Sequence, residues 1–341
     1  MCEQHGIGAG LSAHRLGASG ERRTVSSERI DLEPVERVDV TIVMDTYVDI
    51  LLAGQDGVER FPVAYDWAER DNLVAEHGFS ALITVHEAGH STSILYDGGL
   101  SPDGLARNLA VMELPVGELR ALVISHGHVD HYGGLEGLFR RSGRNGMPLL
   151  IHPHAWRERK VVFPTGVEIG LPPPRKGDLE REGLEVIEER GPTLLMDDTV
   201  LVSGEVPRIT DFERGFPIHF AKSGGAWEPD PWIADDQNVV VNVAGKGLVV
   251  VSGCSHAGAV NVLENAREVT GVQDIAGYVG GFHLTGAVFE PIIERTVAEF
   301  AKRRIERLVP AHCTGWKATH LLARALPEAF VQPSVGTVFS F

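Results

Sequence analysis

Cysteine is scarce in this chain: Cys2, Cys254 and Cys313 are the only three among 341 residues. They are too few and too scattered for the disulfide framework of a small secreted protein, so we expect an intracellular protein. No apolar run reaches the length that spans a bilayer, and the N-terminus lacks a basic-then-apolar signal pattern. The sequence therefore predicts a cytoplasmic protein without a membrane partner.

Positive charge is also in short supply. Lys and Arg together number 31 against 47 Asp and Glu, which gives a formal net charge of −16. Such a balance argues against a general surface for nucleic acid or anionic lipid. We expect a small-molecule substrate and no nucleic-acid partner, and leave open whether the chain forms a homo-oligomer. An anionic substrate would need a local attraction, which a metal ion could supply.

Low complexity and disorder are excluded, because 43% of the residues are apolar and only 23% are charged, enough to bury a large core. Residues 1–36 show no sustained apolar period, and we predict an N-terminal extension there. Residues 37–341 are predicted to form one domain. Within it, 157–231 carries many charges and three consecutive prolines, which indicates an inserted flap or lid.

The apolar pattern predicts strands alternating with helices along this domain. Expected strands cover 38–44, 79–86, 92–96, 121–124, 149–152, 199–203, 239–243, 248–252, 275–279 and 307–310, and expected helices cover 102–112, 133–142, 259–269 and 291–302. Several strands are apolar throughout, as strands covered on both faces are. Two sheets with helices outside them fit this order.

The segment from Ser125 to His131 places four ligand-capable side chains between a buried strand and a helix. In an extended segment alternate side chains point the same way, so His126 and His128 are predicted to grip one cation. The following turn redirects Asp130 and His131 toward a second one. Four such side chains within six positions are hard to explain as chance, because burying them uncompensated beside a core strand would be costly.

Imidazole and carboxylate ligands suit borderline-soft divalent metals. We therefore predict two divalent ions, with zinc as the first choice and iron or manganese as alternatives. Asp130 has two possible roles: it ligates a metal, and it orients or deprotonates a nucleophilic water.

The run His-Gly-His-Val-Asp-His after an apolar strand resembles the signature of the metallo-β-lactamase superfamily. Two further segments extend the resemblance: Tyr96 to Gly99 is similar to the superfamily's strand end that contains aspartate, and Val250 to Gly253 is similar to the strand that delivers a bridging aspartate. The resemblance covers most of the chain from about Val38 onward. It implies an αββα sandwich, in the α/β class, with two mixed sheets, helices outside them and metals at one edge.

The chain departs from the common pattern where Cys254 stands in place of the bridging aspartate, and no mid-chain Gly-His-Thr motif is evident. The segments around Cys254, His283 and His312 resemble the subgroup named for dihydropterin-ribofuranosylaminobenzene phosphate synthase. The resemblance implies that His312 is the last ligand. His256, in a glycine-flanked turn after a buried strand, is predicted as another.

Three further positions remain open. Cys254 is either a thiolate ligand or a buried core cysteine, and His283 is a ligand, a substrate contact or a structural histidine. The pair Asp235 and Asp236 stands near the place of the missing mid-chain ligand, or only caps a loop.

These residues favour a metal-dependent hydrolase that acts on an ester, a phosphoester or a similar bond through metal-activated water. Two alternatives use the same ions: a transferase of the kind that names the subgroup, and a di-iron redox enzyme. A purely structural metal site is disfavoured, because such sites are closed and typically rich in cysteine. Ser255 beside His256 lacks the Gly-x-Ser-x-Gly pattern of a serine hydrolase.

Overall fold

The computed structural model describes residues 11–16, 22–27, 29–62, 71–142 and 146–341. Within these ranges the strands form two mixed eight-stranded sheets and one four-stranded sheet. The first sheet has the order β11 (Glu185–Glu188), β8 (Pro148–Ile151), β7 (Leu119–Val123), β6 (His90–Tyr96), β5 (Ser80–Glu87), β3 (Arg37–Met44), β20 (Val338–Ser340) and β4 (Val58–Glu59). The second has the order β19 (Arg307–Ala311), β18 (Ile275–Gly281), β17 (Gly247–Ser252), β16 (Asn238–Val243), β13 (Val200–Val202), β12 (Thr193–Leu195), β1 (Leu11–Leu16) and β2 (Arg22–Ser27).

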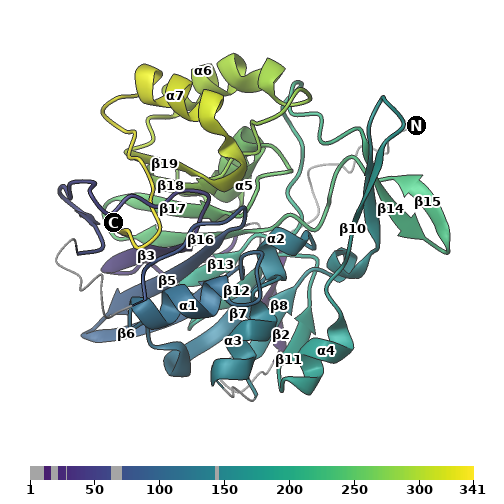
Figure 1. The fold of residues 1–341 in the computed structure, drawn as a ribbon. Helices are drawn as coiled ribbons and strands as arrows, with labels where there is room; N and C mark the ends of the chain where they lie inside the picture. The colour runs from purple at the N-terminus through teal and green to yellow at the C-terminus, as the bar shows by residue number, and fades with distance from the viewer. Residues whose placement is uncertain (1–10, 17–21, 28, 63–70, 143–145) are drawn as a thin grey trace.

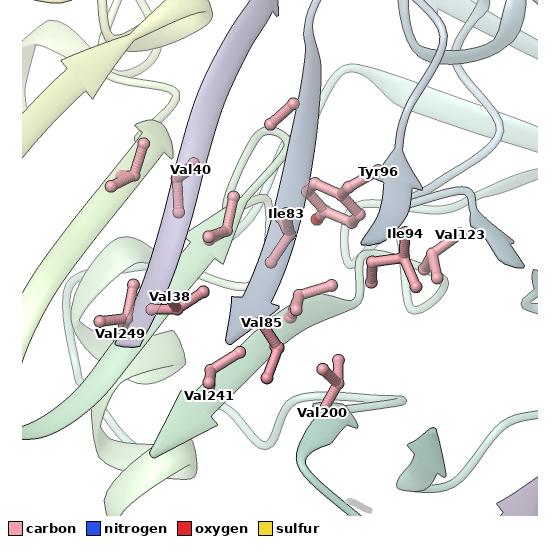
Figure 2. Close-up of a cluster of buried hydrophobic side chains, with 14 of the residues drawn as sticks. Val38, Val40, Ile83, Val85, Ile94, Tyr96, Val123, Val200, Val241 and Val249 are labelled. Carbon is pink, nitrogen blue, oxygen red and sulfur yellow. The ribbon is translucent and has the colours of Figure 1, made fainter. Parts of the chain in front are cut away.

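The two large sheets face each other across the main core. Val38 and Val40 of the first sheet and Val241 and Val249 of the second point into the space between them (Figure 2). Alternate residues of β16 and β17 face this core and the residues between them pack under the outer helices, so these two strands are apolar on both faces. Each fully buried branched side chain contributes about 1.5–3 kcal/mol to folding.

Helices cover the outer face of each sheet (Figure 1). The first sheet carries α1 (Gly104–Val111) and α3 (Leu135–Ser142), whose leucines pack on its strands. The second carries α5 (Ala259–Thr270), α6 (Ile293–Arg303) and α7 (Trp316–Ala325). The predicted αββα sandwich is confirmed, and each predicted strand and helix overlaps an observed one.

The segment predicted as a flap divides between two structures. Part of it, with β10 (Glu168–Leu171), β9 (Arg159–Val162), β14 (His219–Ser223) and β15 (Ala226–Pro229), forms the four-stranded sheet, called here the flap sheet. The rest includes α4 (Lys176–Arg181) and supplies β11, β12 and β13 to the large sheets. Part of the predicted N-terminal extension pairs with the second sheet, through β1 beside β12, whereas 1–10, 17–21 and 28 lie outside the described residues. The predicted boundary near residue 37 stays a prediction.

None of the helices in the described ranges combines the length and the hydropathy needed to cross a bilayer. The predicted cytoplasmic location, small-molecule substrate, absence of a nucleic-acid partner and possible homo-oligomer stay predictions.

The topology brings several strand ends to one edge of the sandwich. In the first sheet β6, β7 and β8 are parallel, and in the second β17, β18 and β19 are parallel. Parallel strands end on the same side, and in open α/β sheets this carboxyl edge is where ligands bind. The loops that follow β7, β17, β18 and β19 carry all the predicted metal ligands.

Candidate metal centre

Two backbone hydrogen bonds, to Asp97 and to Asp235, hold the loop that follows β7 in place. The backbone N–H of Ser125 donates to Asp97 Oδ1 at 2.7 Å, and that of Gly127 donates to Asp235 Oδ2 at 2.9 Å. A Cβ at Gly127 would lie 2.2 Å from the carbonyl oxygen of Ala155, so only glycine fits here. The loop then enters the short helix α2 (Val129–Tyr132), which carries Asp130 and His131, and the His131 ring lies 4.2 Å from the His126 ring, centroid to centroid.

Three histidines converge to form a first ligand group. His126 Nε2 lies 2.9 Å from His128 Nδ1 and 3.2 Å from His256 Nε2. All three side chains are buried, and one nitrogen of each lies within 4.8 Å of the others. Burial lowers the pKa of each imidazole well below its usual value, so the rings are neutral and keep a lone pair for a cation.

A second ligand group lies beside the first. Asp130 Oδ2 is 3.7 Å from His131 Nε2 and 3.3 Å from His312 Nε2. Cys254 Sγ is 3.2 Å from the same His131 nitrogen and shares a compact group with His126 and His131. Cys254 thus stands between the two groups, where a ligand could serve both.

The structure therefore brings together all six residues predicted as ligands, with His256 on the first group and His312 on the second. Their role as metal ligands stays a prediction. The donor set fits divalent ions, because it combines the three neutral imidazoles of the first group with two further histidines, one carboxylate and a nearby thiol. Both ring nitrogens of His312 and Nδ1 of His256 are buried without a hydrogen-bond partner in the described part of the chain. A bound cation would satisfy the Nε2 atom of His312.

A carboxylate behind the second group fixes the orientation of one ligand. Asp97 Oδ2 accepts hydrogen bonds from Ser125 Oγ and His131 Nδ1, both at 2.7 Å. His131 Nε2 is thereby left facing Asp130, as in carboxylate–histidine–metal arrangements. Burial alone would lower the pKa of His131, but the carboxylates of Asp97 and Asp130 raise it to about 9. A metal ion binding there at neutral pH would displace this proton.

Asp130 is ionised in this setting. Burial raises the pKa of the Asp130 carboxyl, but the neighbouring rings of His131 and His312 lower it by a larger amount. The pKa of Asp130 therefore lies well below its usual range. Its side chain is 19% exposed, whereas those of His131 and His312 are fully buried. His77, on the solvent side, places Nε2 3.6 Å from Asp130 Oδ2. The carboxylate therefore forms the part of the second group that water can reach.

The flap sheet supports the first group from behind. His128 Nε2 lies 3.1 Å from His219 Nε2 on β14, and His219 Nδ1 lies 2.9 Å from the backbone oxygen of Asp230. On β9, the buried Arg159 donates to Asp235 Oδ1 at 2.5 Å, and Asp235 accepts from the loop at Gly127. Sequence reasoning missed His219 and Arg159, because neither lies in a motif.

One set of tautomers is consistent with the hydrogen bonds from His128 through His219 to Asp230. If His128 uses Nδ1 toward a cation, its Nε2 carries the hydrogen and donates to His219 Nε2. His219 then donates from Nδ1 to Asp230. Burial lowers the pKa of His219 to about 4, so this ring is neutral at neutral pH and accepts that bond.

Replacing His219 tests its effect on the first group. We expect His219→Phe to weaken metal binding there about 10- to 100-fold, the range seen when the hydrogen-bond partner of a metal ligand is lost. His219→Gln should restore most of the affinity, because its amide oxygen can accept from His128. Chelator competition would measure both variants. Equal affinity for His219→Phe and the parent protein would contradict the role, and failure of both variants would indicate that the ring only fills space.

The remaining predicted positions have distinct places. Asp235 holds the loop through Gly127, and Asp236 accepts from the backbone of Ala257 at 3.2 Å; neither joins a compact ligand group in the described ranges. The structure thus favours the loop-holding interpretation of this pair. His283 lies beside His256, with ring centroids 4.3 Å apart, and groups with it and Cys254. Cys313 Sγ lies 3.2 Å from Cys254 Sγ.

The buried neutral histidines predict acid sensitivity of the metal-free protein. His219 has a folded pKa of about 4, below the ordinary value of 6.5, so the unfolded chain binds more protons between these limits. His219 should therefore lower the free energy of unfolding by up to about 3 kcal/mol as pH drops from 6.5 toward 4, whereas Asp236, whose pKa burial raises to about 7, contributes in the opposite direction. Urea unfolding at a series of pH values would measure this. His219→Gln, which has no titrating group there, should show a smaller loss of stability over that interval, and an equal loss in both proteins would contradict the assignment of a neutral ring to His219.

Comparison with known proteins agrees with this architecture. The family model described as the metallo-beta-lactamase superfamily matches residues 75–206. A protein of Methanocaldococcus jannaschii named 7,8-dihydropterin-6-methyl-4-(beta-D-ribofuranosyl)-aminobenzene-5'-phosphate synthase is 28% identical over 293 residues, which are 84% of this chain and 97% of that protein. An uncharacterized protein of the same organism is 32% identical over 265 residues, 77% of this chain and 93% of that protein.

A solved structure of a metal-dependent hydrolase of the beta-lactamase superfamily shares the fold, with a TM-score of 0.65 and 24% identity over 88% of this chain and 98% of that one. The chain belongs to the metallo-β-lactamase superfamily. Its similarity to the synthase bears out the resemblance predicted from the segments around Cys254, His283 and His312.

Proposed function

We propose that this protein is a hydrolase of small organic substrates that depends on two divalent metal ions. The observation that carries the proposal is the meeting of two sets of ligand-capable side chains at one sheet edge. His126, His128 and His256 form a compact group, and beside them Asp130 Oδ2 lies 3.7 Å from His131 Nε2 and 3.3 Å from His312 Nε2. Bound at such a pair, divalent ions lower the pKa of water toward about 7 and polarise the scissile bond. Zinc suits the mixed nitrogen, oxygen and sulfur donors, and iron or manganese are the alternatives.

The chain's own residues supply the orientation and the proton acceptor. Asp97 and His219 fix the rings of His131 and His128 from behind, so the ligands need no rearrangement before the reaction. Asp130 is ionised and partly exposed, and its Oδ2 accepts a proton from the attacking water or orients it. No serine or cysteine nucleophile is required by this mechanism.

A synthase-type transfer is the second candidate. It is supported by the 28% identity to the Methanocaldococcus jannaschii synthase over 84% of this chain. In that reaction the same ions would stabilise a diphosphate leaving group in place of activating water.

Product analysis distinguishes the two. The protein, loaded with zinc, iron or manganese in turn, would be given a panel of aryl and alkyl esters and phosphoesters, and separately a pterin diphosphate with an arylamine. Metal-dependent release of acid and alcohol supports the hydrolase, whereas arylamine coupling without hydrolysis of the panel contradicts it. Elemental analysis of the purified protein identifies the metal, and iron with oxygen-dependent turnover would instead favour the redox alternative.

A further inference from the structure

A pocket of about 220 Å³ opens directly beside the first ligand group. It lies between the loop at 212–217 and the segment 282–292, and His256 and His283 form part of its wall. Most of the remaining wall is apolar, with Phe212, Leu284, Phe289 and Ile292 among its members. A substrate held at the metal ligands would therefore extend into a largely apolar space.

The acidic group in this wall is already satisfied. Glu213 Oε1 accepts from the backbone of Val260 at 2.8 Å, and Oε2 accepts from the backbone of Asn261 at 3.0 Å and from Thr210 Oγ1 at 2.9 Å. These bonds cap the start of α5 and leave the carboxylate little capacity for a ligand. The pocket therefore does not recognise a cationic group through Glu213.

Aromatic rings give the pocket its shape. Phe289 stands edge-on to His283, with ring centroids 4.5 Å apart and planes at 83°. Phe216, which does not itself line the pocket, contacts both of them, with ring centroids 5.8 Å from His283 and 5.2 Å from Phe289. Edge-on and tilted contacts of this kind are the preferred geometry between aromatic rings. A further flat ring entering the pocket would extend the same packing.

The volume sets the size of the occupant. An apolar protein cavity of about 150 Å³ is known to hold benzene, so a space of about 220 Å³ holds one ring with small substituents. The ring of His283 forms part of the wall beside His256, so it contacts a group that fills this space.

We propose that this pocket binds an aryl group of the substrate, next to the bond that reacts at the metal ligands. The proposal rests on the proposed function, because the reacting end must be held by the metal ions. His283 then contacts the substrate, which is one of the roles left open by the sequence.

The affinities for two phosphonates test the pocket and the metal site separately. Methylphosphonate and phenylphosphonate carry the same anionic head, but only the second carries a ring. Burying a phenyl group predicts that phenylphosphonate binds the zinc-loaded protein roughly 10- to 100-fold more tightly. In Phe289→Ala this ratio should fall to about threefold or less, while the affinity for methylphosphonate and the zinc content stay unchanged. Calorimetric titration measures both ligands.

Ile169→Ala is the matched control, since Ile169 is an apolar residue of the flap sheet, 49% exposed, that does not line the pocket. It should keep the parental ratio. A ratio near one in the parent protein, or an unchanged ratio in Phe289→Ala, overturns the aryl pocket and leaves the metal site intact. Binding of neither phosphonate overturns the proposed metal site and the pocket together.

Discussion

His128→Ala is expected to lose both tight metal binding at the first ligand group and turnover. Structural zinc sites of four protein ligands bind with about 10–16 kcal/mol, so one ligand accounts for about 2.5–4 kcal/mol, or roughly 70- to 900-fold in affinity. His126 and His256 would not replace it, because one nitrogen of each already belongs to the same compact group. His126→Ala should behave in the same way. Elemental analysis and chelator competition measure the metal, and the hydrolysis panel measures turnover.

His152→Ala is the matched control for these variants. His152 is also fully buried near the carboxyl edge, but its ring bonds Glu205 and belongs to no compact ligand group in the described ranges. It should retain its metal. Full turnover by metal-free His128→Ala would refute the metal-dependent mechanism.

Asp130→Asn is expected to retain the first ion but to lose most of the turnover. The amide cannot accept a proton from water, and loss of a general base typically lowers the rate about 100- to 10,000-fold. The three histidines of the first group are untouched, so the first ion should remain, while the second binds more weakly because its carboxylate is gone. The expected kinetic signature is a fall in kcat larger than any rise in KM.

Asp103→Asn provides the comparison for this variant, because the Asp103 side chain is 76% exposed at the start of α1. It should leave both ions and kcat unchanged. Parental kcat in Asp130→Asn would show that this carboxylate neither holds the second ion usefully nor accepts a proton.

The sandwich could be predicted from the sequence because its signals are local. β17 contains a run of four apolar residues, and all six of its residues are buried. A short glycine turn joins it to β16, so the sequence alone predicts the hairpin. The metal loop was predictable for the same reason, since its four ligand-capable side chains are neighbours in sequence.

The contacts that support the site depend instead on tertiary packing. His128 and His219 are 91 residues apart in the sequence, and Arg159 and Asp235 are 76 residues apart. Neither β9 nor β14 has a sequence pattern that predicts a contact with the loop that follows β7. A single buried histidine or arginine has no periodicity of its own. The flap segment shows the same limit: its charges and prolines predicted an insertion, but its short apolar pieces β12 and β13 belong to the second sheet.

We propose that two divalent ions bind between the loop after β7 and the loops after β17 and β19. Anomalous diffraction at the zinc, iron and manganese absorption edges, on crystals grown with each metal, tests it most directly. We expect two peaks about 3.5–4 Å apart, one beside His126, His128 and His256 and the other beside Asp130, His131 and His312. Crystals soaked with metal that show no peak at this edge, with the imidazoles turned away from one another, would contradict it.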